Sequence, residues 1–306
     1  MTSTDALKVF SDLFAIVAPV FAGAGLGWLW GHLKRPFDHA MVTALATQIA
    51  TPCLIFSTLT RMDVTTAAFG EIALAALVSY ALMGALGAGV LLALRQPFHS
   101  YLPSLMFGNI GNMGLPLSLF AYGHAGLALA IAVFAVGAVL QFTLGVWITS
   151  GKGSPAELLR TPILYAVAAA MAFMIAGEKP PLWLHNSTRL IGELMIPLML
   201  LALGVSLASL RVASLSRAVG FSVLRLAGGF ACGVLVAWAM GLTGAARGVL
   251  IVQSTMPVAV FNYLFAKAYD RKPEEVAGIV LISTLISLAT LPLLLLAVLR
   301  WDMPGL

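Results

Sequence analysis

Polar residues that could bind a small solute are concentrated in two apolar stretches of the chain. Their amide and hydroxyl groups donate and accept hydrogen bonds without carrying a full charge, which suits an anionic or dipolar ligand that must bind and then leave. Glycines and prolines lie between them, and these residues interrupt helices and free backbone N–H and C=O groups. The candidate binding residues are Asn109, Gly111, Asn112, Gly114 and Pro116 in the first stretch, and Gln253, Ser254, Thr255, Pro257 and Asn262 in the second.

The segments that must position these residues are long and apolar. Of the 306 residues, 60% are hydrophobic and 9% are charged, and the mean hydropathy is +1.00. A typical soluble domain has about 25% charged residues, so a soluble protein is excluded and an all-α polytopic membrane protein is predicted. The net charge of +5 is carried by the loops, so it reflects membrane topology and we expect no nucleic-acid partner.

Charged or Pro- and Gly-rich breaks divide the chain into ten apolar segments, each long enough to cross a bilayer. The linker at 151–155 separates five from five, so we expect one five-helix repeat at 1–151 and a second at 152–306. Because five is odd, the second repeat is inserted in the opposite sense and the repeat is inverted. The predicted helices span residues 8–31, 40–60, 68–94, 100–122, 126–149, 159–177, 188–209, 216–241, 245–269 and 274–299.

The positions of four prolines agree with such a repeat. Pro52 and Pro116 are 64 residues apart in the first half, and Pro197 and Pro257 are 60 apart in the second. The predicted helices 4 and 9 are therefore both broken at membrane depth, where freed backbone groups are tolerated only inside protein or beside a watery cavity. Paired broken helices of this kind indicate the binding site of a transporter. The alternative is that the helices are only kinked and their amides bond neighbouring helices.

Other polar residues within the membrane have two readings each. Gln141, in predicted helix 5, either joins the binding site or bonds a neighbouring helix. Arg225, in predicted helix 8, either pairs with substrate or an acid, or snorkels to the surface. Glu193 follows Arg189 by four residues, a spacing that favours an interfacial ion pair, and Lys267 lies near a helix end. Arg225, Glu193 and Lys267 are therefore the candidate charge partners of a ligand.

The loop charges predict the orientation. The loops after predicted helices 1, 3, 5, 7 and 9 carry ten Lys and Arg residues, and the opposite side carries six. The positive-inside rule then places both termini outside an inner (plasma) membrane. The sequence has no metal-ligand spacing, phosphate loop or nucleophile–base pattern, so we expect no enzyme, no metal and no cofactor.

The motifs resemble those of the auxin efflux carrier family, which includes the plant PIN transporters and bacterial carriers. Predicted helix 4 has the family pattern of Asn109 followed by 114–117 (Gly-Leu-Pro-Leu) and Tyr122-Gly123. Predicted helix 9 matches through Gln253, Pro257 and 265–267 (Phe-Ala-Lys), and predicted helix 5 through Val139-Leu140-Gln141. The resemblance implies the inverted-repeat fold shared with bile acid:sodium symporters. It also implies that helices 4 and 9 cross at Pro116 and Pro257, and that Asn109 and Gln141 contact the substrate.

The resemblance also implies how the molecule works. Helices 1, 2, 6 and 7 would form a scaffold, often dimeric, and helices 3–5 and 8–10 a transport domain that moves like an elevator. Family substrates are carboxylates, from indole-3-acetate to small dicarboxylates such as malonate or malate. Asn112 stands where the plant proteins have an apolar residue, which favours a smaller and more polar substrate.

Two transport hypotheses follow. The leading one is a secondary transporter of organic anions that binds the carboxylate where helices 4 and 9 cross, with the coupling ion, H⁺ or Na⁺, left open. The alternative is a sodium-coupled symporter of the bile-acid type, with its cation among Gln253, Ser254 and Thr255.

Overall fold

The structure, a computed structural model, describes residues 3–60, 66–151, 162–210 and 212–302, and within these ranges it is all-α, with no β-strand. The helical elements in chain order are α1 (Ser3–His32), α2 (His39–Leu45), the π-helical turn η1 (Ala46–Ala50), α3 (Thr51–Leu59), α4 (Thr66–Ala93), α5 (Phe98–Met106), η2 (Ile110–Gly114), α6 (Leu115–Leu140), η3 (Gln141–Gly145), α7 (Val146–Ser150), α9 (Pro162–Ala176), α10 (Leu182–Gly192), α11 (Met195–Ser209), α12 (Leu215–Ala239), α13 (Gly244–Ser254), α14 (Val260–Ala268) and α15 (Pro273–Asp302).

Seven helical stretches of the described chain are long and apolar enough to cross a membrane, and α9 is a shorter apolar helix. The protein is therefore an all-α, multi-pass membrane protein. The longest stretch, 110–150, contains Gly123 with φ 65° and ψ −159°, a conformation that favours glycine and separates the sequence-predicted helices 4 and 5. The ten-helix inverted repeat stays a prediction. Its boundary at 151/152 and four of the loop cations that set the orientation, Arg61, Lys152, Arg160 and Arg211, lie at or outside the edges of the described residues.

Five of the predicted helices are interrupted in the structure, including predicted helix 5, which is divided by η3. Predicted helix 2 is α2, η1 and α3, and predicted helix 7 is α10 and α11. Predicted helices 4 and 9 are each broken by a short extended segment, at 107–109 and around 257–259. Pro52 and Pro116 are each the second residue after a π-helical turn, and proline has no N–H to continue the regular hydrogen-bond ladder.

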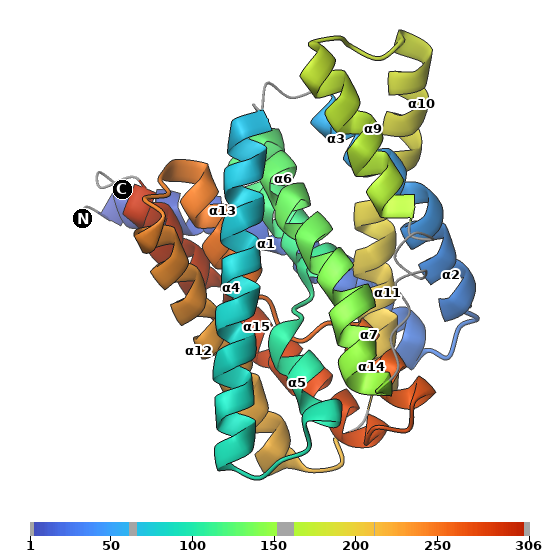
Figure 1. The fold of residues 1–306 in the computed structure, drawn as a ribbon, viewed down its shortest axis with the longest axis vertical. Helices are drawn as coiled ribbons and strands as arrows, with labels where there is room; N and C mark the ends of the chain where they lie inside the picture. Colours follow the sequence, from blue (N-terminus) through green and yellow to red (C-terminus); the bar gives the residue numbers. More distant parts are fainter. Residues whose placement is uncertain (1–2, 61–65, 152–161, 211, 303–306) are drawn as a thin grey trace.

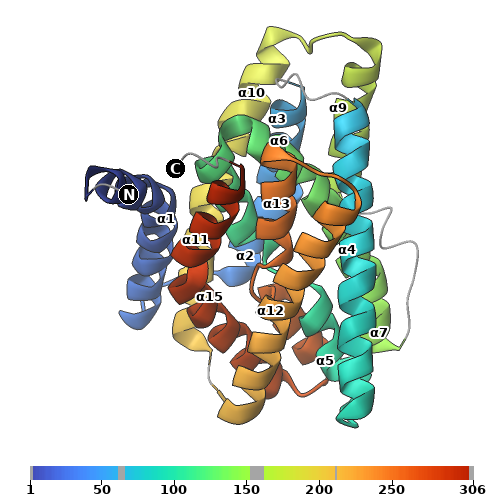
Figure 2. The ribbon, with the colours of Figure 1, turned by 90° about the vertical axis from the view of Figure 1, so that its left-hand side faces the viewer.

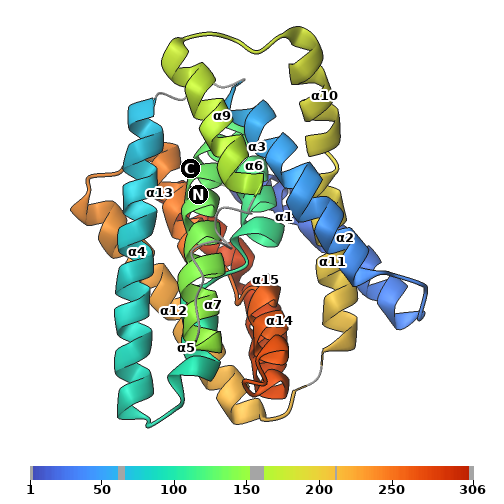
Figure 3. The ribbon, with the colours of Figure 1, turned by 45° about the vertical axis from the view of Figure 1, so that its right-hand side comes forward.

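The helices pack in two sets. In Figures 1 and 3, α2, α3, α10 and α11 lie to one side and α4, α12 and α13 lie to the other, with α5, α6 and α7 between them. The helix α9 packs on α3. Figure 2 shows α1 (dark blue) beside α11. The α1–α11 contact depends on small residues: a Cβ added at Gly27 would lie 2.1 Å from the Leu201 carbonyl oxygen. Such close backbone approach is how membrane helices associate in the absence of a hydrophobic driving force.

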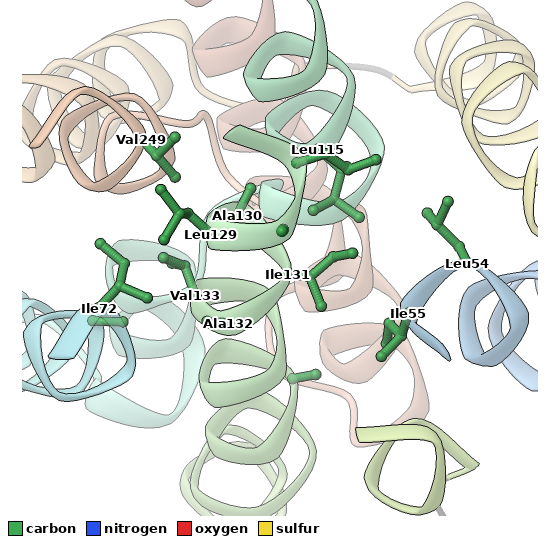
Figure 4. Packing of buried hydrophobic residues seen from close by; sticks show 14 of the residues in the cluster. Leu54, Ile55, Ile72, Leu115, Leu129, Ala130, Ile131, Ala132, Val133 and Val249 are labelled. Carbon is green, nitrogen blue, oxygen red and sulfur yellow. The ribbon is translucent and has the colours of Figure 1, made fainter. Parts of the chain in front are cut away.

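The centre of the molecule is packed around α6. Figure 4 shows its residues 129–133 facing Val249 of α13 and Ile72 of α4, with Leu54 and Ile55 of α3 across from Ile131. These side chains are all buried. The helix α6 therefore touches both sets of helices, and residues 107–114, the first half of the polar region described next, lead directly into it.

Candidate functional site

The two broken helices cross where their extended segments meet. Gly108 and Val258 form an isolated antiparallel bridge. The Asn109 N–H donates to the Pro257 carbonyl at 2.6 Å, and the Ala259 N–H donates to the Phe107 carbonyl at 3.1 Å. Each break therefore satisfies part of the other's freed backbone inside the protein, as a membrane interior requires.

The crossing point differs from the one that the resemblance implied. The chains meet at Gly108 and Val258, next to Pro257, whereas Pro116 lies further along, in the first turn of α6. Gly108 is the residue that permits the contact, because a Cβ there would lie 2.3 Å from Nη2 of Arg225 and 3.0 Å from the Met256 carbonyl oxygen. Val258 is also bonded to α15, because its N–H donates to Oγ of Ser283 at 3.1 Å.

One side of the crossing carries the amide residues and two helix N-termini. Helical structure restarts at Ile110 in one arm and at Val260 in the other. A cavity of about 40 Å³ opens there, and its lining includes Asn109, Gly111, Asn112, Gln141 and Ala259. Asn109 is 4% exposed, and its Nδ2 has no hydrogen-bond partner among the described residues.

Gln141 and Asn262 connect this side to the rest of the crossing. The Gln141 Nε2 donates to the Asn262 Oδ1 at 3.3 Å, and the Asn262 Nδ2 donates to the Phe107 carbonyl at 3.0 Å. Gln141 begins the π-helical turn η3, an irregularity often found at functional positions. The amides of Asn109, Gln141 and Asn262, which the sequence placed on three separate helices, thus come together at the crossing.

The other predicted polar residues lie on the far side of the crossing. The Gln253 Nε2 donates to Oγ of Ser118 at 3.3 Å, while its Oε1 has no partner in the described parts of the chain. Gly114 is required beside it, because a Cβ there would lie 2.1 Å from that Oε1. The Ser254 hydroxyl bonds Ser79 of α4 at 2.9 Å. The Thr255 hydroxyl donates to the Ile251 carbonyl, one helical turn earlier, at 2.7 Å.

The three candidate charge partners separate in space. Arg225 of α12 is buried at the crossing. Glu193 pairs with Arg189 at 2.7 Å, as the four-residue spacing predicted, and lines a separate cavity of about 270 Å³. Lys267 is exposed beside another cavity, near Glu274. The structure therefore brings only Arg225 into the polar centre.

Sequence reasoning missed several parts of this centre. Ser79 and Tyr80 of α4 line a cavity with Arg225, Gln253 and Ser254, and a polar pair in the middle of an apolar helix was the available signal. The Phe107 carbonyl, which accepts from both Ala259 and Asn262, carries no such signal, because any residue has a carbonyl.

Interrupted helices that cross at a polar centre, in an all-α membrane protein, are typical of membrane transporters. The chain matches the family described as membrane transport protein over residues 12–158 and 150–295. It therefore belongs to this family, that of the auxin efflux carriers, and it is a transporter rather than an enzyme.

Two relatives give the range of similarity. The chain is 24% identical over 323 aligned positions to a protein of Rhizobium meliloti named "Putative malonate transporter", covering 96% of this chain and 98% of the relative. It is 26% identical over 198 positions to a protein of Methanocaldococcus jannaschii named as an uncharacterized transporter. That second match covers 61% of this chain and only 64% of the archaeal protein.

Proposed function

We propose that the protein is a secondary transporter of small organic anions, mono- or dicarboxylates of the size of malonate, which bind on the amide side of the crossing. The observation that carries the proposal is the buried Nδ2 of Asn109. It is a hydrogen-bond donor without a partner among the described residues, and it lies in the wall of the cavity that both helix N-termini border. A buried donor of this kind is costly unless something accepts from it.

The backbone adds positive potential at the same place. A helix N-terminus is equivalent to about half an elementary positive charge, and its first N–H groups have no partner within the helix. The arms that begin at Ile110 and Val260 both start at the crossing. A carboxylate there would accept from backbone N–H groups and from the Asn109 amide without forming a fixed ion pair, which favours release.

The cavity volume favours a mechanism in which the site opens. About 40 Å³ holds roughly three water molecules, which is less than a dicarboxylate needs. The larger cavity near Glu193 lies between α3, α10 and α11 on one side and α6 on the other. We therefore propose that α4–α7 and α12–α15 move together against α1–α3 and α9–α11, in an elevator-type cycle built on the ten-helix inverted repeat.

The relative named as a putative malonate transporter supports a small dicarboxylate as the substrate, because the similarity extends over nearly the whole length of both chains. Asn112, which lines the cavity beside Asn109, agrees with a polar substrate. An inner-membrane location with both termini outside, and a homodimer formed through the scaffold, remain predictions from the sequence and the resemblance.

Counterflow in proteoliposomes tests the proposal. Vesicles loaded with unlabelled malonate should accumulate labelled malonate, and Asn109→Ala and Gln141→Ala, which both change the wall of the amide-side cavity, should each reduce the initial rate at least tenfold. Asn186→Ala, which truncates an exposed asparagine of α10, should leave the rate unchanged. Unchanged rates in both crossing variants would show that the site is elsewhere, and no counterflow with any small carboxylate would refute the substrate class.

A further inference from the structure

Arg225 is a buried charge without a charged partner among the residues that the structure describes. Its exposure is 2%, and the part of the chain that the structure describes contains no ion pair or hydrogen bond to its guanidinium, with Nε fully enclosed. Burying an ionised group is strongly unfavourable unless the surroundings supply opposite charge. Some feature of the fold must therefore balance this guanidinium.

The guanidinium lies against both arms of the crossing at once. A Cβ added at Gly108 would lie 2.3 Å from Nη2, and one added at Gly229 would lie 2.9 Å from Nη1 and 2.1 Å from the Ser254 carbonyl oxygen. Gly108 follows the end of α5 at Met106, and Ser254 ends α13. Arg225 is therefore placed at two helix C-termini, on the opposite side of the crossing from the helix N-termini.

The opposite charge comes from these two ends. A helix C-terminus is equivalent to about half an elementary negative charge, so two of them balance about one guanidinium. The oxygen atoms around the Arg225 guanidinium add further negative potential. Ser254 and Met256 contribute backbone carbonyls close to it, Gln253 contributes an Oε1 without a partner among the described residues, and Ser79 and Ser254 contribute hydroxyls.

Oxygen atoms of this kind are the ligands that hard cations prefer. We propose that Arg225 is a built-in counter-charge that takes the place of a dissolved monovalent cation at the crossing, so that the protein keeps the two broken helices together without binding Na⁺ or K⁺ there. This role does not depend on which solute is carried. It also argues against the cation that the sodium-symporter hypothesis placed among Gln253, Ser254 and Thr255, because the guanidinium already lines that cavity.

Thermal unfolding of the purified protein tests the proposal. Melting temperatures would be measured in NaCl, KCl and N-methyl-D-glucamine chloride from 1 to 300 mM, for the wild type, Arg225→Ala and Arg217→Ala. The wild type should respond equally to the three salts. Arg225→Ala should melt lower in N-methyl-D-glucamine and gain about 3 °C for each tenfold rise in Na⁺ or K⁺ above its dissociation constant. Arg217→Ala removes a charge from the same helix, at its exposed ion pair with Glu275, and should show no cation preference.

Two further variants keep the test decisive if Arg225→Ala does not fold. Arg225→Lys keeps the charge and should be insensitive to the choice of cation, whereas Arg225→Gln removes the charge with less loss of volume and should show the same Na⁺ or K⁺ stabilisation. Cation-independent stability of Arg225→Ala or Arg225→Gln would overturn the proposal, as would Na⁺-specific stabilisation of the wild type. A chloride-specific stabilisation of the wild type over gluconate would also overturn it, since it would show that the guanidinium is balanced by an anion. These melting temperatures do not require transport, so this proposal can fail or succeed independently of the proposed substrate site.

Discussion

At the scale of single residues, the crossing separates two kinds of polar chemistry. The amides of Asn109, Gln141 and Asn262 lie on the side of the helix N-termini, and Arg225 lies on the side of the C-termini. Glycines permit this separation, because the backbones and the guanidinium approach too closely for any side chain. Gly229 shows this most clearly, with the Ser254 carbonyl oxygen 2.1 Å from where its Cβ would be.

The matched pair Gly229→Ala and Gly220→Ala tests this packing on one helix. Both glycines lie in α12, but a Cβ at Gly220 would meet nothing within 4 Å among the described residues. Gly229→Ala must push α13 away from α12 and should lower the free energy of unfolding by about 1–3 kcal/mol. Gly220→Ala should be neutral or stabilising by about 0.5–1 kcal/mol, because alanine is the better helix former. Equal melting temperatures in detergent for the two variants would contradict the close contact.

At the scale of elements, the two extended segments hold each other by backbone hydrogen bonds. The bridge at Gly108 and Val258 is flanked by the bonds from Asn109 to Pro257 and from Ala259 to Phe107. A backbone N–H or C=O left without a partner in the membrane interior is costly, and these bonds supply the partners. The crossing should therefore be sensitive to the loss of a single N–H.

Proline substitutions at two adjacent residues separate the loss of this N–H from the general effect of introducing a proline. Ala259 has φ −68°, which proline adopts, so Ala259→Pro removes little except the N–H that donates to Phe107. It should cost about 1–3 kcal/mol of stability and abolish uptake. Val260→Pro falls at the first position of α14, where proline is well tolerated, and should cost less than about 1 kcal/mol. A stable, active Ala259→Pro protein would show that the bridge is dispensable.

The sequence predicted where the polar breaks are, but not how they meet. Asn109, Gln253 and Asn262 were recognisable as polar residues in apolar helices, and Pro257 marked its break correctly. The meeting point at Gly108 was missed because it depends on backbone approach and on Arg225 behind it, which are tertiary features. The π-helical turns before Pro52 and Pro116 were missed for a related reason: a proline indicates that the ladder is disturbed, but not whether the chain kinks, bulges or unwinds.

At the scale of the whole molecule, α6 is the helix of the proposed moving set (α4–α7 and α12–α15) that faces α3 of the other set. Its residues pack on α4 and α13 of one set, and on α3 of the other. If the sets move past each other during transport, the boundary between α3 and α6 must change while contacts within each set persist. The cavity lined by Ser57 of α3 and Phe120 of α6 lies on this boundary.

Cysteine cross-linking distinguishes movement at this boundary from movement elsewhere. In a background without Cys53 and Cys232, joining Ser57→Cys to Phe120→Cys with a short bifunctional reagent should stop uptake, with the cross-link quantified by peptide mass spectrometry. Phe56→Cys with Phe173→Cys provides the control, because these rings, 5.7 Å apart, join α3 to α9 within one set. Full uptake by completely cross-linked Ser57→Cys/Phe120→Cys protein would contradict an elevator-type movement.

Equilibrium binding of labelled malonate to the purified protein shows whether a small carboxylate binds beside Asn109. The substitution Asn109→Asp keeps the shape of the side chain but replaces its Nδ2 donor, which has no partner in the described ranges, with an acceptor oxygen. Asn186→Asp makes the same chemical change at an exposed position of α10. We predict saturable binding to the wild type and to Asn186→Asp, and at least a tenfold weaker affinity for Asn109→Asp. Equal affinities for all three proteins would contradict the account.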